Sequence, residues 1–405
     1  MNGKRLSNSE ERSSQVGKEI TRREILRAGL VATSLLAIGV PEWAIPALAQ
    51  GETLVPFTDI PENFNPGSPN SPVRVYDIRK ITTEDPFTPR DEFFAIGHYG
   101  QPEIDASTFR LQVTGLVDSP MELSLADLQA RPSVELAAGY ECSGNSGRRV
   151  HGLASNGLWT GTLLSNLLTD VGVRQEAREV VFFGTDHGEQ DVTFRNQSFK
   201  LDQQFARSMS LENAMKPEPL LAYALNGEPL PRKQGFPLRL VMPGWYGVAN
   251  VKWLSGIHVQ EDRFVGHYQA RWYRTVMGET IGGDLKFTEN EVTRMQLKSV
   301  IARVTRRGGG YQILGFVLND GTPLRSVEVK VDDGPWQPAT LEASNSQYSW
   351  KLFTYSWQGA TAGEHTLVSR ATDVTGKVQS TEADLETKRT FLEHSAQFPR
   401  TVMIS

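Results

Sequence analysis

The sequence predicts an α+β protein in which a mixed α/β domain is followed by an all-β, immunoglobulin-like sandwich. In the first part of the chain, apolar strand-like runs end in glycine-rich loops, and the run 162–168 has the apolar spacing of a helix. Past residue 260, short alternating runs are separated by turn signals, a pattern typical of antiparallel sandwiches. A chain of 405 residues is long enough for two such domains.

Changes in composition predict four segments along the chain. We expect a leader at 1–49, an extended arm rich in Pro, Asn and Ser at 50–90, a site-bearing domain at 91–260 and the sandwich at 261–405. The sandwich strands are expected at 299–305, 311–317, 327–331, 349–355 and 363–371. Gly308 to Gly310 is interpreted as a hairpin turn between two of these strands.

The first 49 residues have the three parts of a twin-arginine export signal. Arg22 and Arg23 precede an apolar run at 28–40, and an A-x-A site follows at 47–49. The apolar run is about 13 residues, short of the roughly 20 that a membrane span needs. We therefore expect a periplasmic protein with no membrane span in the mature chain. The alternative is an uncleaved N-terminal anchor.

Charge and cysteine content narrow the functional class. The chain has 42 Lys and Arg against 47 Asp and Glu, a formal net charge of −5. This balance argues against nucleic acid or anionic lipid as a general partner. A single cysteine in an exported chain cannot form an internal disulfide, which favours a reactive thiol or a ligand.

That cysteine, Cys142, occupies the most informative stretch. It follows a predicted strand at 134–138, lies in a glycine-rich loop and precedes Arg148 and Arg149. A lone Cys is often only a small buried hydrophobe. A Cys–His hydrolase using His151 or His187 is a second reading. A thiolate on a soft metal, with arginines for an anionic ligand, accounts for more of the features. One Cys cannot hold a metal alone, so a cofactor would supply the other ligands.

Other predicted strands also end at loops with polar side chains, as expected for a cofactor site built from strand ends. Ser124 is expected to cap a helix that starts near Leu125, the run 205–214 is predicted to be a loop, and Asn226-Gly227 is a strong hairpin signal. The strands at 93–98, 179–183 and 236–243, and the segment after Gly247, carry or lead to the polar candidates His98, Asp186, Arg239 and Lys252.

Several motifs are absent from the sequence. It contains no G-x-x-x-x-G-K-[ST], no H-E-x-x-H, no C-x-x-C and no G-x-G-x-x-G after a strand. It also lacks C-x-x-C-H, so we expect no haem in this chain.

Five segments, in this order, resemble the sulfite oxidase family of molybdopterin enzymes over essentially the whole mature chain. The loop 142–149 is similar to the family's cysteine loop, and 93–98 to the segment that contacts the pterin. The stretches 221–239, 250–253 and 348–379 are similar to the family's later motifs, including its dimerisation domain.

The resemblance implies a fold, a cofactor and a set of site residues. Cys142 would ligate molybdenum beside molybdopterin, with Arg148 and Arg149 at the catalytic centre. The implied cofactor-binding residues are His98, Asp186, Arg239, Asn250 and Lys252. The implied reaction is oxidation of sulfite or a related inorganic sulfur compound by oxygen-atom transfer at molybdenum. Electrons would pass to a separate cytochrome c-type partner, in a homodimer or a heteromer with a haem subunit.

The chain departs from the family pattern near the substrate. Ile96 and Ala249 stand where the resemblance places arginines, Gln234 where it places a histidine, and Phe205 where it places the active-site tyrosine. Arg148, Arg149, His151 or Arg207 would have to compensate. Two alternatives therefore stay open: a periplasmic reductase of S-oxides such as methionine sulfoxide, and a non-catalytic subunit that binds sulfur compounds.

Overall fold

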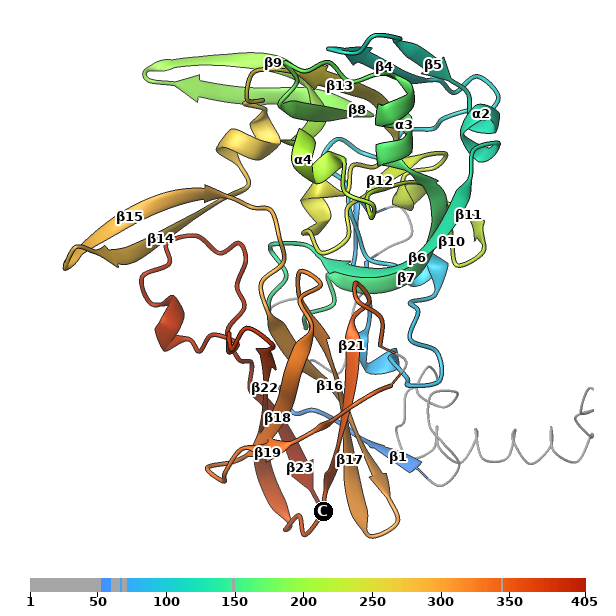
Figure 1. The fold of residues 1–405 in the computed structure, drawn as a ribbon. Coiled ribbons are helices and arrows are strands. Elements are labelled where there is room, and N and C mark those ends of the chain that lie inside the picture. The colour runs from blue at the N-terminus through green and yellow to red at the C-terminus, as the bar shows by residue number, and fades with distance from the viewer. Residues whose placement is uncertain (1–51, 60–65, 68–70, 148–149, 344) are drawn as a thin grey trace, which may run out of the picture. The chain divides into compact units, whose positions relative to one another are not determined.

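The computed structural model describes residues 52–59, 66–67, 71–147, 150–343 and 345–405 (Figure 1). The chain divides into two units, 1–48 and 49–405, and all the described residues belong to the second. The predicted leader, Arg148 and Arg149 lie outside the described residues. No helix among the residues described is long and apolar enough to cross a membrane.

The cysteine loop grows out of a five-stranded antiparallel sheet. Its order is β11-β10-β7-β6, and β12 also pairs with β10. The bounds are Ser133–Glu141 (β6), Ala154–Leu163 (β7), Leu220–Leu225 (β10), Glu228–Pro229 (β11) and Arg239–Val241 (β12). Asn226 and Gly227, both at positive φ, form the predicted turn between β10 and β11.

A second five-stranded sheet, of order β5-β4-β13-β8-β9, completes this part of the chain. Only β4 and β13 pair in parallel. The bounds are Leu111–Gly115 (β4), Met121–Leu123 (β5), Glu179–Phe194 (β8), Gln197–Ser210 (β9) and Leu254–Gln260 (β13). A small sheet pairs β2 (Val73–Arg74) with β3 (Ala95–Ile96), just before His98.

Among the described residues the architecture is mostly β, so the predicted mixed α/β domain overstates the helix content. The α-helices are Leu125–Gln129 (α2), Leu164–Asp170 (α3) and Leu211–Ala214 (α4). Helix α2 begins at the expected cap, where Ser124 and Asp127 form a reciprocal capping box. Helix α3 follows directly from β7, so the apolar run at 162–168 is part strand and part helix.

Two predicted chain breaks are wrong. Strand β8 does not end at Phe183 but runs on to Phe194, and the pairing shift between Phe183 and His187 absorbs the glycine-rich segment as a bulge. The predicted loop at 205–214 is instead the end of β9 followed by α4. In both places pairing with a distant strand overrides the local turn signals.

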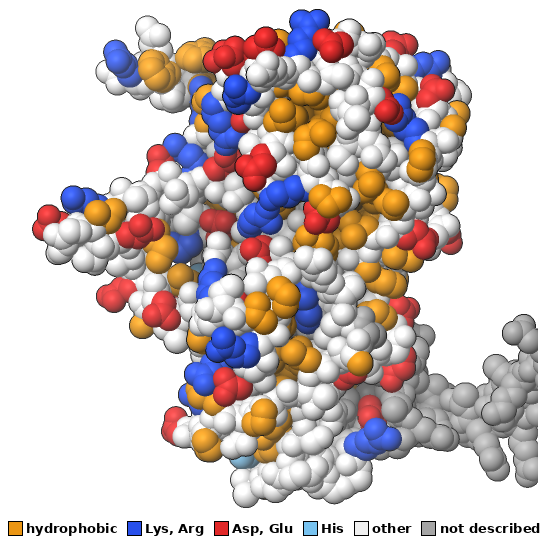
Figure 2. Space-filling view, viewed as in Figure 1, with side chains coloured by type: hydrophobic (Ala, Val, Ile, Leu, Met, Phe, Trp, Pro, Cys, Tyr) orange, Lys and Arg blue, Asp and Glu red, His pale blue; other side chains and the backbone are white. Residues whose placement is uncertain are grey.

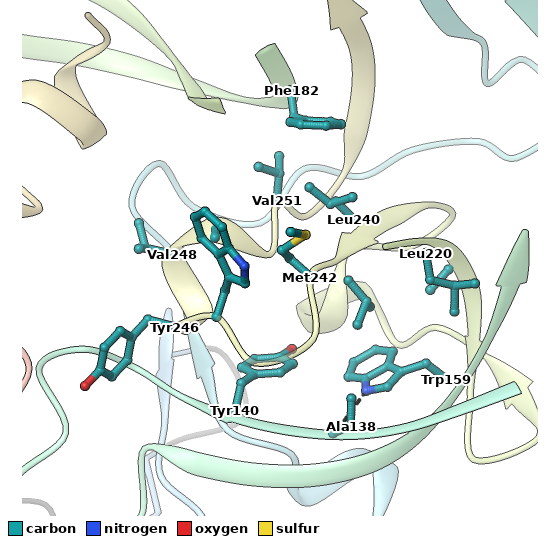
Figure 3. Packing of buried hydrophobic residues seen from close by; sticks show 14 of the residues in the cluster. Ala138, Tyr140, Trp159, Phe182, Leu220, Leu240, Met242, Tyr246, Val248 and Val251 are labelled. Carbon is teal, nitrogen blue, oxygen red and sulfur yellow. Dashed lines mark hydrogen bonds between the residues drawn. The ribbon is translucent and has the colours of Figure 1, made fainter. Parts of the chain in front are cut away.

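The apolar core of this first part lies between the two sheets and the loops that carry the site (Figure 3). Trp159 is fully buried, and its indole Nε1 donates to the carbonyl of Ala138 at 3.0 Å. Tyr140 stacks beside Trp159, with 6.0 Å between ring centroids. Strand β6 is thereby fixed against β7 immediately before Cys142.

The C-terminal part contains two antiparallel sheets around a separate apolar core, as the sandwich prediction requires. One has the order β1-β16-β17-β21-β20, and the other β19-β18-β22-β23. Their bounds are Glu52–Val55 (β1), Lys298–Arg307 (β16), Gly310–Leu318 (β17), Leu324–Val331 (β18), Gln337–Pro338 (β19), Thr340–Leu341 (β20), Lys351–Trp357 (β21), Gly363–Asp373 (β22) and Arg400–Ile404 (β23). All five predicted strands are present, and the N-terminal arm adds β1 to the edge of β16.

A β-hairpin precedes the sandwich strands β16 to β23 in the chain, and a segment close to the C-terminus runs beside it. The hairpin pairs β14 (Arg274–Ile281) with β15 (Asp284–Glu291), after the π-helical turn His267–Arg271 (η7). The segment 380–399 runs beside it, with a bridge between Met277 and Lys388 (Figure 1). On the face seen in Figure 2, basic and acidic side chains are interspersed, with no patch of a single sign.

Candidate active site

One pocket brings together all six described members of the predicted site. These residues lie far apart in the sequence but all line the same cavity: His98, Cys142, Asp186, Arg239, Asn250 and Lys252. Its empty volume is about 570 Å³, including the open space at its mouth. The remaining walls are mainly aromatic and aliphatic, so a few polar groups converge in an otherwise apolar cavity.

Cys142 is half-buried and is the first residue after β6. Its amide donates to the carbonyl of Leu153 at 2.8 Å, and its carbonyl accepts from the amide of Asn145 at 2.9 Å. A Cβ on Gly144 would lie 3.2 Å from the ring of Phe391 and 3.9 Å from Cys142 Sγ. The cysteine therefore lies in a tight turn where the segment 380–399 approaches it closely.

Arg239 supplies a buried positive charge to the pocket wall. Its Nη1 donates to Gln234 Oε1 at 2.9 Å and to the Gln234 carbonyl, and Nη2 donates to the carbonyl of Asn250. The guanidinium also lies over the ring of Trp159, 4.8 Å from its centroid. No carboxylate among the described residues is within ion-pair distance of Arg239. A buried cation held by neutral acceptors is well suited to an anionic ligand.

Lys252 and Asp186 face the same cavity with opposite charges. Lys252 Nζ donates to the carbonyls of Ile96 at 2.9 Å and Lys233 at 3.1 Å. Burial lowers the pKa of Lys252 to about 7, with the charge of Arg239 adding to the effect. Burial raises the pKa of Asp186 to about 6, although the charge of Lys252 opposes that rise. Asp186 Oδ1 is buried and has no hydrogen-bond partner.

Asn250 lines the pocket, but its side chain braces the surrounding loop. Its Oδ1 accepts from the amide of Met242 at 2.7 Å, and its Nδ2 donates to the carbonyls of Tyr246 and Trp245. These bonds engage the polar atoms of the amide. Asn250 therefore shapes the loop that presents Lys252, and its side chain is not available as a ligand without breaking them.

His98 is part of an aromatic cluster on one side of the pocket. Burial, reinforced by the charge of Lys252, lowers the pKa of His98 to about 4, so the ring is neutral at pH 7. Its Nε2 shares a hydrogen bond of 2.8 Å with the hydroxyl of Tyr273. Phe205 stacks on His98 with 5.2 Å between centroids. The pocket thus contains the apolar ring of Phe205 and also a tyrosine hydroxyl.

Tyr273 lines the pocket, although the sequence analysis did not single it out. It immediately precedes β14, is 8% exposed and lines the same pocket as Cys142. Burial and the neighbouring Cys142 raise its pKa, which keeps the phenol protonated. Phe205 lines the pocket as the sequence predicts, and Tyr273 places a tyrosine hydroxyl in the same cavity. The stretch Arg271-Trp272-Tyr273 gave no local signal, because it falls in what the sequence predicts to be the second domain.

Two residues expected to compensate for missing arginines lie elsewhere. Arg207 is buried in an ion pair with Glu291 at 2.9 Å and also donates to the carbonyls of Tyr268 and Val292. His151 is buried against Phe398, with 4.4 Å between ring centroids. Neither is among the residues that line the pocket. The other two candidates, Arg148 and Arg149, fall outside the described residues.

The pocket fits a cofactor with anionic and N–H-donating groups and a soft metal. Arg239 offers a cation, Asp186 Oδ1 an open acceptor, and Cys142 the thiolate that soft metals prefer. Gly184 leaves no room for a Cβ between the Asp186 carboxylate and the carbonyl of Lys252. These three groups are compatible with a molybdenum–pterin cofactor.

Comparison with known proteins indicates the same kind of cofactor. The model of a family described as "Oxidoreductase molybdopterin binding domain" matches residues 98–268. The matched range contains six of the predicted site residues in the pocket: Cys142, His98, Asp186, Arg239, Asn250 and Lys252. Fold and site together define a molybdopterin-binding oxidoreductase.

Individual relatives narrow the class. The chain is 30% identical over 335 residues to human mitochondrial sulfite oxidase, which covers 75% of this chain and 59% of the human protein. It is also 30% identical to the NADH nitrate reductase of Ulva prolifera, over 75% of this chain and 35% of that protein. The structure is similar to the sulfane dehydrogenase SoxCD from Paracoccus pantotrophus, with a TM-score of 0.70, 25% identity, and coverage of 84% of this chain and 88% of that one.

Within that class, the chain belongs to the sulfite oxidase family, as the cysteine loop and its neighbouring motifs predict. The chain spans 53% of the length of rat and 59% of the length of human mitochondrial sulfite oxidase.

Proposed function

We propose that this protein is an exported, molybdenum cofactor-dependent oxidoreductase that acts on a small sulfur compound. The observation that carries the proposal is the pocket itself. It places the sole cysteine of the chain beside Arg239, Lys252 and Asp186, with Tyr273 and His98 along one side. When bound, the molybdenum cofactor supplies two-electron oxygen-atom transfer.

Different residues of the chain would hold different parts of the cofactor. Cys142 would be the thiolate ligand of the metal. Arg239 and Lys252 would hold an anionic group such as a phosphate, because both are basic side chains that face the cavity. Asp186 Oδ1 would accept a hydrogen bond from a pterin N–H, which would satisfy its buried lone pair.

Tyr273 and His98 would act on the substrate side. The Tyr273 hydroxyl is protonated and can donate a hydrogen bond to a substrate oxygen. His98 is neutral at pH 7 and fixes that hydroxyl through their shared bond of 2.8 Å. Phe205 and Tyr268 pack around His98 and limit the entry of water.

Oxidation of sulfite or a related inorganic sulfur compound is the reaction we favour. Similarity to sulfite oxidases and to a sulfane dehydrogenase supports a sulfur substrate. Electrons would pass to a separate cytochrome c-type partner, since the sequence has no C-x-x-C-H motif. The twin-arginine leader at 1–49 supports a periplasmic location.

A second candidate is an S-oxide reductase, favoured by one feature of the pocket. Phe205, Ile96 and Val248 line it, and Ala249 is buried beside it, where a dianion would need cationic partners. A neutral sulfoxide would fit such walls better. The remaining alternative is a non-catalytic subunit that binds sulfur compounds.

The experiment that separates these functions starts from a preparation shown to contain molybdenum. Sulfite-dependent reduction of an artificial one-electron acceptor supports the oxidase. Turnover of methionine sulfoxide with a reduced dye, and none with sulfite, supports the reductase. Purified protein that contains no molybdenum when the cofactor is available during expression contradicts both enzymes and supports the binding subunit.

A further inference from the structure

The sandwich contacts the cysteine loop through a buried lysine. Lys298 is the first residue of β16 and is 2% exposed. Its Nζ donates to Glu141 Oε2 at 2.9 Å and to the carbonyl of Asn145 at 3.2 Å. Glu141 immediately precedes Cys142, and Asn145 lies three residues after it. One ammonium group therefore holds both ends of the turn that presents the cysteine.

The turn is also closed by its own hydrogen bonds, which converge on the same atoms. Asn145 Nδ2 donates to Glu141 Oε2 and to the carbonyl of His151, both at 2.9 Å. Asn145 Oδ1 accepts from the amide of Leu153 at 3.0 Å. Glu141 Oε2 accepts from both Asn145 and Lys298, so a movement of the lysine would displace both ends of the turn.

A second contact fixes the strand that leads into the turn. The amide of Gly139 donates to the carbonyl of Tyr348 at 2.9 Å, and Ala138 forms a parallel bridge with Tyr348. Tyr348 lies just before β21 of the sandwich. The sandwich therefore contacts β6 through Tyr348 before the turn, and contacts the turn itself through Lys298.

Stability alone does not explain a charged pair at this depth. The side chains of Lys298 and Glu141 are 3% and 2% exposed. The desolvation of such a pair offsets much of its attraction, and uncharged pairs of similar volume are often equally stable. What the charged pair adds is direction, because the ammonium must meet two specific oxygens on opposite ends of one turn.

We propose that Lys298 is a positioning residue that fixes the turn 141–145 so that Cys142 faces the pocket. The sandwich then serves as the scaffold of the ligand loop. The inference rests on the proposed function in one respect, that Cys142 is the ligand presented there. It is tested without turnover and without molybdenum, so its failure and the failure of the proposed function are separate results.

The test compares the full chain with the double variant Glu141→Gln, Lys298→Met. Because both charges are removed together, we expect the unfolding midpoint to stay close to that of the wild type. We expect the backbone amides of 142–147 to exchange hydrogen roughly tenfold faster or more, since the turn has lost its outside anchor. Alkylation of Cys142 by iodoacetamide at a single fixed pH is expected to accelerate to a similar degree.

The matched control is the double variant Glu328→Gln, Arg370→Met. This is another charged pair of the sandwich, in which Arg370 Nε of β22 donates to Glu328 Oε2 of β18 at 2.8 Å. The pair lies within one sandwich sheet, away from the cysteine turn and from Tyr348, so exchange at 142–147 should stay within about twofold of the wild type. Wild-type exchange and alkylation in the Glu141→Gln, Lys298→Met variant would overturn the proposal.

A measurement on the unaltered chain covers the case in which the Glu141→Gln, Lys298→Met variant does not fold. If Lys298 fixes the turn, the Asn145 amide, bonded to the Cys142 carbonyl, should be protected to a degree close to that of the β16 amides. Exchange of the Asn145 amide more than about a hundredfold faster than that of β16 would show that the turn opens independently, and would refute the positioning role.

Discussion

Replacing Asp186 by Asn should stabilise the cofactor-free protein and weaken its hold on the cofactor. The carboxylate is 4% exposed, and Oδ1 has no hydrogen-bond partner. Its ionised form is therefore unfavourable until a ligand donates to it. The amide keeps the shape of the side chain but removes the charge.

The size of the effect follows from the pKa. Burial raises the pKa of Asp186 from 3.8 to about 6, and each pKa unit corresponds to about 1.4 kcal/mol, so the buried charge costs about 3 kcal/mol above pH 6. The folded state binds this proton more tightly than the unfolded state. The wild type therefore loses this stability as pH rises from about 4 to about 6, and the loss is complete at higher pH.

Urea unfolding of cofactor-free wild type and Asp186→Asn at several pH values measures this directly. We expect the variant to be more stable by about 2–3 kcal/mol at pH 8, because the buried amide still lacks a partner, and the difference to vanish near pH 4. Molybdenum content per chain should fall at the same time. A variant less stable than the wild type at pH 8, or one that retains full molybdenum, would refute the reasoning.

Two further predictions concern the pocket. Arg239→Met should lower molybdenum content per chain about tenfold or more, because a charge-assisted hydrogen bond to an anionic group contributes roughly 1.5–3 kcal/mol; metal analysis checks this, and full loading would argue against an anion at Arg239. Tyr273→Phe leaves His98 Nε2 without its partner, so the free energy of unfolding should fall by about 1–3 kcal/mol and turnover should fall about tenfold or more. Denaturation and steady-state kinetics measure both effects, and unchanged turnover would exclude the hydroxyl from the reaction.

Local sequence signals were sufficient to predict the sandwich strands, a helix cap, a hairpin turn and the position of Cys142 after its strand. Ser124 caps a helix and Asn226-Gly227 turns a hairpin, because their side chains and backbone preferences act within a few residues. Cys142 follows its strand directly, as the glycine-rich stretch indicates. The polar candidates meet in one pocket, although Asp186 lies in a bulge within β8 and not at a strand end.

Long-range pairing was not readable from the sequence. Strand β8 continues through Gly184 because β9 supplies a partner for its backbone, and no local pattern specifies that partner. Tyr273 reaches the pocket only after η7 turns the chain back toward His98. The sequence analysis did not single out Lys298, because its contact with Glu141 depends on how the two parts of the chain pack.

X-ray absorption at the molybdenum edge tests the central claim that Cys142 binds the metal in this pocket. The wild type and Cys142→Ser would be purified with the cofactor present, and their metal–sulfur shells compared. If Cys142 is a ligand of the metal, the variant should show one sulfur ligand fewer than the wild type and should have lost turnover. A variant that keeps the wild-type number of sulfur ligands and remains active would contradict the assignment.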